Sequence, residues 1–244
     1  AIGVALLPLL SRQIQAGDED AARASQNRAI EMSLLLTVPA SIGLGVLSAP
    51  VVSTLFEGGA FTAADRVAVA NALAVFAFGL PAYVLNKGLT PGFFARHDTR
   101  TTVIVSAAAL VVNIAPNVAF MKILGHVGIA VGSTVSAWLN AGLLAVILRR
   151  RRHLVADARL RRRLPRLIVA SLVMGVAVWI GAQAVDSLLG PVFGAPGADP
   201  GPLLLRIAVL TLLIGGGVIV FGIAAFACGA AERSDLHLLK RRRS

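Results

Sequence analysis

The sequence predicts an all-α fold, a polytopic transmembrane helical bundle, and three observations lead to it. The chain of 244 residues is 57% hydrophobic and only 14% charged, with a mean hydropathy of +0.80. A soluble domain carries about 25% charged residues, so the composition excludes a soluble globule. Several apolar stretches are long enough to cross a bilayer. The loops between them alternate between rich and poor in basic residues.

Six apolar stretches are candidate membrane spans. A transmembrane helix needs about 20 mostly apolar residues, because each residue rises about 1.5 Å across a hydrocarbon core about 30 Å thick. The stretches lack the polar and apolar alternation of a strand, which favours helices over a barrel. They are residues 32–56, 67–86, 101–121, 123–148, 167–185 and 207–229.

The basic residues predict the orientation of these spans. Nineteen of the 23 Lys and Arg residues lie in one set of alternating loops and end segments. The other set holds only Arg66, Lys122 and Arg206, and Lys87 lies near the end of a span. Basic loops are retained on the cytoplasmic side of a membrane. Both ends of the chain are therefore predicted to be cytoplasmic.

The most basic loop, residues 149–166, could bind nucleic acid. Its position between two spans favours contact with anionic lipid instead, so we expect no nucleic-acid partner. Residues 17–31 combine mixed charge with strong helix formers, which predicts a short helix running into the next span. Residues 1–10 are apolar from the start, unlike a signal peptide. We expect them to end a helix that begins earlier, in a longer membrane protein.

Polar residues within the spans are the first functional candidates, because polar groups in a bilayer are costly and usually face the bundle interior or an aqueous cavity. Asn113 and Asn117 lie four residues apart beside Pro116 and share one helix face. They could line a cavity or hydrogen-bond to neighbouring helices. Both alternatives stay open at this point.

Small residues and prolines predict packing and bending. A ladder with four-residue spacing favours close helix packing over substrate contact. Its members are Gly128, Gly132, Ser136 and Asn140. The first span holds Pro39 and Pro50, and glycines between them predict a bent helix.

Charged residues near the predicted cytoplasmic end are the second set of candidates. Lys87 follows Asn86 and is the one charge predicted to lie within the membrane. Its long stem could carry the ammonium to the cytoplasmic headgroups, or the cation could face a cavity and meet an anionic substrate such as a phosphate. Arg96 and Asp98 are either ordinary loop charges or a gate pair.

The sequence holds no arrangement typical of catalysis or of metal binding. The four His residues lack the HExxH spacing, and the single Cys228 lies in an apolar run. The carboxylates on the predicted outer side are scattered, and neither GxSxG nor a phosphate-binding glycine loop is present. We therefore expect a protein that is not an enzyme and that has no cofactor and no metal.

Four stretches in order along the chain carry a family resemblance. They are LLPLLSRQIQAGD at 6–18, LFEGGAFTAAD at 55–65, FGLPAYVLNKGLTPGFFARHDTRT at 78–101 and LGHVGIAVGSTVSAWLNAGLLAVILRRR at 124–151. Together they resemble the MurJ (MviN) family of lipid II flippases, within the multidrug/oligosaccharidyl-lipid/polysaccharide exporter superfamily. The four motifs in this order make the resemblance specific, which no single one would.

The resemblance implies a two-lobe transporter in which two extra helices follow the C-terminal lobe. Such proteins move the polyprenyl-linked peptidoglycan precursor across the bacterial inner membrane by alternating access, driven by an ion gradient or the membrane potential. The extra pair forms a groove thought to hold the polyprenyl tail. The implied partners are this precursor, membrane lipids and a missing N-terminal lobe of the same protein.

On this view the chain divides into four parts. Residues 1–152 are a partial C-terminal lobe, 153–166 a basic cytoplasmic linker, 167–229 the extra helix pair and 230–244 a basic cytoplasmic tail. The family's essential cavity arginines lie mainly outside this chain. The candidates for substrate binding or gating are therefore Lys87, Asn86, Arg96, Asp98, Asn113 and Asn117. An exporter of another polyprenyl-linked saccharide and a non-transporting membrane scaffold remain alternatives.

Overall fold

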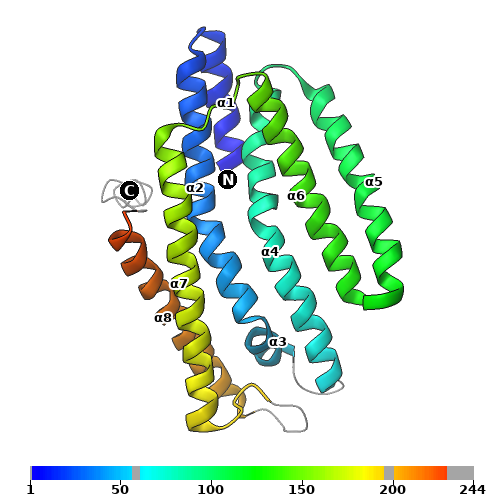
Figure 1. The fold of residues 1–244 in the computed structure, drawn as a ribbon, viewed down its shortest axis with the longest axis vertical. Helices are drawn as coiled ribbons and strands as arrows, with labels where there is room; N and C mark the ends of the chain where they lie inside the picture. Colours follow the sequence, from blue (N-terminus) through cyan, green and yellow to red (C-terminus); the bar gives the residue numbers. More distant parts are fainter. Residues whose placement is uncertain (1, 57–60, 195–200, 230–244) are drawn as a thin grey trace.

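Eight α-helices account for most of the chain that the structure describes. The structure is a computed structural model, and it describes residues 2–56, 61–194 and 201–229. The helices are α1 (Ile2–Gln15), α2 (Glu19–Val46), α3 (Ser48–Phe56), α4 (Ala63–Phe94), α5 (Thr99–Leu124), α6 (His126–Arg150), α7 (Ala158–Leu189) and α8 (Leu203–Ala227). Except for the short α3, they run roughly along the long axis of the molecule (Figure 1). The predicted all-α bundle is confirmed.

The helices also reproduce the predicted alternation of loops. Over the described residues, α2, α4, α6, α7 and α8 are each long and apolar enough to cross a bilayer. The remaining predicted span corresponds to α5, in which residues Thr99–Ile114 form a shorter apolar helical segment. The N-terminal ends of α2, α5 and α7 lie at one end of the bundle, and those of α4, α6 and α8 lie at the other (Figure 1). We call these the inner and the outer end, after the predicted orientation.

The prediction of one continuous span over residues 32–56 is wrong. The helix α2 ends at Val46, and α3 begins at Ser48 and turns away from it (Figure 1). Pro50 explains the break, because a proline has no N–H to donate to the carbonyl four residues earlier and its ring clashes with that carbonyl. In an unbroken helix that carbonyl would belong to Val46. The predicted bend is therefore an interruption.

Two helices extend further than the apolar stretches predicted. The helix α7 begins at Ala158 rather than at residue 167, so much of the predicted linker 153–166 is helical. Asp157 caps it, with its carboxylate accepting from the Leu160 N–H at 2.8 Å. The helix α4 begins with a capping box between Thr62 and Asp65 and continues to Phe94. Span boundaries drawn from apolar residues alone stop at the first charges, although Arg is a good helix former.

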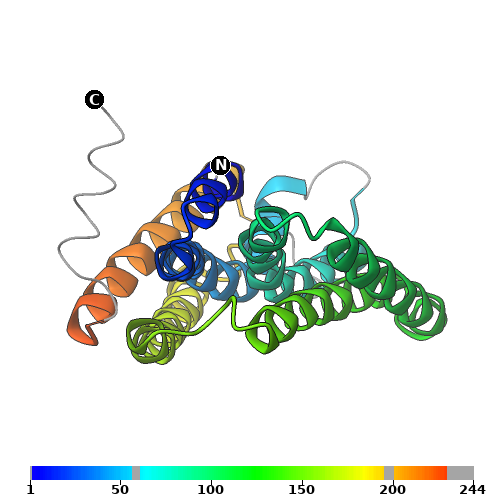
Figure 2. The ribbon, with the colours of Figure 1, turned by 90° about the horizontal axis from the view of Figure 1, so that it is seen from above.

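The cross-section of the bundle is elongated. Figure 2 shows α8 and α5 at opposite ends of it, with α2 and α4 between them. The helix α4 packs against α2 on one side and α6 on the other, α5 packs chiefly on α6, and α7 packs on α2 and α8. The main apolar core lies where α2, α4, α6 and α7 meet, and it includes Leu34, Leu89, Phe93 and Leu144.

Candidate functional site

An apolar groove of about 630 Å³ lies between α2, α3, α7 and α8. Small residues leave this space open. A Cβ at Gly222 would meet no atom within 4 Å, and one at Gly43 would lie 3.6 Å from Met174. The described residues that line it carry no polar side chain: they are Leu35, Leu36, Pro39, Ala40, Gly43, Leu44, Leu47, Val51, Met174, Val178, Ile214, Gly217, Val218, Phe221, Gly222, Ala225 and Phe226. A groove of this size and lining suits a hydrocarbon chain.

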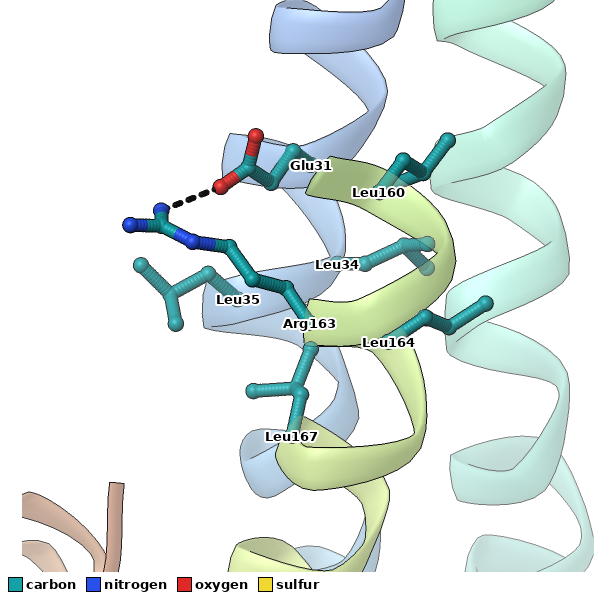
Figure 3. A pocket seen from close by; sticks show the side chains of 7 residues that line it. All are labelled: Glu31, Leu34, Leu35, Leu160, Arg163, Leu164 and Leu167. Carbon is teal, nitrogen blue, oxygen red and sulfur yellow. Dashed lines mark hydrogen bonds and ion pairs between the residues drawn. The ribbon is translucent and has the colours of Figure 1, made fainter. Parts of the chain in front are cut away.

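A charged cluster adjoins the groove toward the inner end. Glu31 of α2 forms an ion pair with Arg163 of α7, and their side chains are 12% and 7% exposed. Figure 3 shows the two side chains pointing toward one another. Both line a small cavity of about 10 Å³. Arg28 and Arg159 also contact Glu31, at 3.3 Å and 3.5 Å. Leu35 lines both this cavity and the groove, so the two are direct neighbours.

The sequence analysis did not single out Glu31 or Arg163. They lie 132 residues apart, so no local spacing pairs them. A weak signal existed, because Glu31 directly precedes the predicted span 32–56 and Arg163 lies within a helical turn or two of the span 167–185. A charge at the edge of an apolar helix can be buried when a neighbouring helix supplies the opposite charge.

The structure places Lys87 on the exposed surface of α4. It contacts none of the described side chains through a hydrogen bond or ion pair, and it lies seven residues, about 10 Å, before the end of α4. Asn86 points elsewhere and donates from Nδ2 to the Ala137 carbonyl of α6 at 3.3 Å. The two candidates are therefore neighbours in sequence with different surroundings.

Arg96 and Asp98 do not bind each other. Arg96 donates from Nη2 to Glu19 Oε2 at 2.5 Å and from Nη1 to the Gly92 carbonyl at 2.8 Å. Asp98 accepts from Arg151 and from the Thr101 N–H, which it caps at the start of α5. Hydrogen bonds from Thr101 and Arg151 lower the pKa of Asp98 to about 2. At the inner end, Arg96 therefore joins α4 to α2, and Asp98 joins α5 to α6.

Asn113 and Asn117 both belong to the contact between α5 and α6. Asn117 donates to Asn113 Oδ1 at 2.8 Å, and Asn113 donates to Ser133 Oγ of α6 at 3.4 Å. The predicted small-residue ladder packs here, since a Cβ at Gly132 would lie 2.1 Å from Asn117 Oδ1. Ser136 of the same ladder donates to the Ala109 carbonyl of α5 at 2.6 Å. Asn113 therefore makes an interhelical hydrogen bond, whereas Asn117 bonds to Asn113 within α5.

Among the residues that the structure describes, no group of three or more His, Cys, Asp or Glu side chains is placed to hold a metal ion. The groove, with the Glu31 cluster beside it, is therefore the most developed site in this part of the molecule. Such a site can hold an apolar chain next to charged groups.

Comparison with known proteins gives a consistent family. The family model "Lipid II flippase MurJ" matches residues 1–196. Three relatives named as probable lipid II flippases MurJ cover most of this chain. The protein of Rhizobium tropici is 40% identical over 100% of this chain and 44% of its own length. The protein of Rhizobium meliloti (strain 1021) is 38% identical over 96% of this chain and 42% of its own length.

The third relative, from Rickettsia prowazekii (strain Madrid E), is 32% identical over 91% of this chain and 41% of its own length. The chain thus spans less than half the length of these curated relatives. The family model covers about four-fifths of the chain, and the relatives extend the similarity across all the described helices. The chain belongs to the lipid II flippase MurJ family.

Proposed function

We propose that this chain supplies the C-terminal part of a transporter that flips lipid II across the bacterial inner membrane by alternating access. The family membership and the names of the relatives support the substrate. The groove between α2, α7 and α8 is the single structural observation that carries the proposal. The protein would move a lipid rather than catalyse a chemical reaction.

The groove would hold the polyprenyl tail of the precursor. Its lining is apolar, and its volume of about 630 Å³ lies within the range of typical ligand pockets. In a bilayer a chain gains little from apolarity itself, so close packing against the groove is what would favour binding. The saccharide and pyrophosphate would lie outside the groove, in a cavity shared with the missing N-terminal lobe.

The inner-end ion pairs would act in gating. Arg96 with Glu19 and Asp98 with Arg151 each join two helices at the end predicted to be cytoplasmic. Opening a cavity toward that side requires inner helix ends to separate. In this proposal both chain ends are cytoplasmic, and the basic loops contact anionic lipid.

Two other functions remain to be separated by experiment. A related transporter could export another polyprenyl-linked saccharide, since a groove for the tail carries no information about the sugar. A membrane scaffold without transport would need no groove, so the cavity between α2 and α8 favours transport.

Complementation of a flippase-depletion strain tests the proposal. We expect a longer parent that includes the N-terminal region of the relatives to restore growth and lipid II flipping, and the 244-residue chain alone to insert without restoring either. Restored growth with the chain alone would contradict the half-transporter proposal. A parent that restores export of a different polyprenyl-linked saccharide, and not of lipid II, would favour the first alternative.

Lys87 gives a sharper test in the same parent. A cation that attracts the pyrophosphate predicts impaired rescue and weaker precursor binding for Lys87→Gln at normal protein levels. An interface anchor predicts no change, because Gln keeps polarity and most of the length. Lys87→Arg is the control and should be tolerated in both cases. Parental flipping rates for Lys87→Gln would remove Lys87 from the substrate-binding candidates.

A further inference from the structure

Two arginines at the outer end of the bundle are almost completely buried. Arg66 in the first turn of α4 is 5% exposed, and Arg206 in the first turn of α8 is 7% exposed. Both are exceptions to the predicted shortage of basic residues on the outer side. Neither contributes to an exposed charged surface, so their role must be sought in the interior.

Each of these arginines donates to a backbone carbonyl of another segment. Arg66 Nη1 donates to the Phe193 carbonyl at 3.1 Å, which ties α4 to the connection between α7 and α8. Arg206 Nη1 donates to the Ser53 carbonyl at 2.6 Å, which ties α8 to α3. Together the two hydrogen bonds join the helix pair α7 and α8 to α4 and α3 at the outer end of the bundle. We call these two bonds the braces.

The Ser53 carbonyl is a suitable acceptor for a guanidinium. It lies in the last turn of α3, whose described residues end at Phe56. The C-terminal end of a helix carries partial negative charge. The break at Pro50, which makes α3 a separate short helix, is therefore what presents this acceptor to α8.

A packed apolar plug lies between the two braces and the groove. It consists of the buried side chains Leu47, Val192, Phe193, Val209 and Leu213. The same buried cluster also includes Met174 and Val178, and these two line the groove together with Leu47. Along α8 the plug lies between Arg206 and Ile214, the first residue of that helix in the groove lining, so it adjoins the outer end of the groove. Toward the inner end α8 leans away from α2 (Figure 1), and the lining continues to Phe226 near the end of α8.

We propose that Arg66 and Arg206 hold the outer end of the groove shut and thereby set the longest lipid chain that the groove accepts. The proposal rests on the proposed function, in which an isoprenoid chain occupies the groove. The arginines are positioning residues, because they act through the plug and need not touch the lipid. Chain length is the property that a closed end selects, whereas a groove open at both ends would let a longer chain pass through.

The closure itself can be measured without any isoprenoid ligand. Spin labels at Phe56→Cys and Leu204→Cys, both exposed positions, would report the distance between α3 and α8 in the 244-residue chain, with Cys228→Ser and in nanodiscs of phosphatidylcholine. We expect a narrow distance distribution in the parent and in Arg206→Lys, and a broad one shifted to longer distances in Arg206→Gln and Arg66→Gln. Arg161→Gln is the matched control, since Arg161 is exposed at the opposite end of α7.

Chain-length preference is then measured with farnesyl, geranylgeranyl and undecaprenyl phosphate as the probes. We expect the parent and Arg206→Lys to bind one length best, and Arg206→Gln to lose this preference while its helical circular dichroism stays unchanged. A merely structural role of Arg206 would weaken the binding of all three lengths equally.

The outcomes separate the two proposals. An unchanged spin-label distance in Arg206→Gln overturns the closure, and so does a length profile in Arg206→Gln identical to that of the parent. If the parent binds no probe of any length, the groove's proposed function and the length limit both fail, and the spin labels alone decide whether the arginines close the outer end. Should Arg206→Gln lose its helical signal, Arg66→Gln provides the same test from the other brace.

Discussion

Two helix contacts in this molecule are built in opposite ways. The contact between α4 and α6 is held along its length by side chains that donate to backbone carbonyls of the facing helix: Thr134 to Val75, Trp138 to Phe78, Tyr83 to Ser133 and Asn86 to Ala137. Around the groove, the polar contacts described between α7 or α8 and their neighbours lie at the two ends. Glu31 binds Arg163 toward the inner end, and Arg206 binds the Ser53 carbonyl at the outer end.

The difference shows what makes room inside a membrane protein. Apolar side chains line both contacts, so apolarity does not distinguish a filled contact from an open one. In a bilayer, packing and interhelical hydrogen bonds hold helices together. A contact with bonds along its length closes, whereas a contact held at its ends can leave a cavity between them.

Breaking the inner tie of the groove should have the largest effect. Glu31→Gln leaves the Arg163 guanidinium buried without this carboxylate, and removal of one partner of a buried ion pair costs about 3–5 kcal/mol. We expect a loss of stability at or below the lower end of that range. The reason is that the cluster is not fully desolvated, because Arg159, which also contacts Glu31, has a partly exposed side chain. The free energy of unfolding in a detergent titration measures it. The double change Glu31→Gln with Arg163→Met should recover part of the loss, and a double variant as unstable as the sum of both single variants would contradict the pairing.

A matched pair of glycines in α8 separates close packing from open space. A Cβ at Gly217 would lie 2.8 Å from Val178 Cγ2, whereas one at Gly222 would meet nothing within 4 Å. Gly217→Ala should therefore destabilise the contact between α7 and α8 by about 1–3 kcal/mol through overpacking. Gly222→Ala should leave stability unchanged or raise it by up to about 1 kcal/mol through helix propensity. Equal effects of the two changes on the unfolding free energy would show that the groove is not open at Gly222.

The contact between α4 and α6 should respond weakly to the loss of one bond. Trp138→Phe removes the donor to the Phe78 carbonyl, at 3.1 Å, and interhelical bonds in membranes average about 0.6 kcal/mol. The expected change in unfolding free energy is of that size. Trp179→Phe on α7 is the control, since Trp179 is 55% exposed, and it should have no effect. A loss of several kcal/mol in Trp138→Phe alone would mean that the bonds of this contact act as one cooperative unit.

The smallest effect concerns the inner end of the α5 and α6 pair. The pKa of Asp98 is lowered from 3.8 to about 2 by Thr101 and Arg151, so the folded state favours the carboxylate. The stabilisation is fully present above about pH 4 and is lost as pH falls toward 2. Asp98→Asn should flatten the pH dependence of unfolding in that interval and leave neutral pH little changed. An equally steep dependence in Asp98→Asn would assign it to another carboxylate.

The sequence predicted most of the helices and the alternation of their connections, because both depend on local composition. Apolar runs and the alternation of basic loops are properties of neighbouring residues. The extension of α7 back to Ala158 was missed because its first turns are basic, and only the cap at Asp157 marks the start. At Pro50 the sequence predicted a bend, whereas the structure has an interruption. A proline shows that a helix is perturbed, but the packing around it decides whether the helix bends or breaks.

The site was much less predictable, because its pairs are distant in sequence. Glu31 meets Arg163 and Ser53 meets Arg206 through the tertiary fold alone. In the sequence, Arg66 and Arg206 stood out only as basic residues on the side predicted to be poor in them. Asn113 and Asn117 were placed on one face correctly, but whether that face meets a cavity or a helix depends on α6. The roles of Lys87, Arg96 and Asp98 in transport stay predictions.

The bond between Arg206 and Ser53 also has a consequence for biosynthesis. The two residues are 153 positions apart, so the ribosome completes α3 long before α8 emerges. With a mean hydropathy of 2.6, α8 is apolar enough to enter the bilayer unaided, yet it carries a guanidinium that is costly to leave without acceptors there. The acceptor, the Ser53 carbonyl, is already in the membrane when Arg206 leaves the translocon. Final docking of the last helix is thereby made dependent on the earlier folding of the first half of the chain.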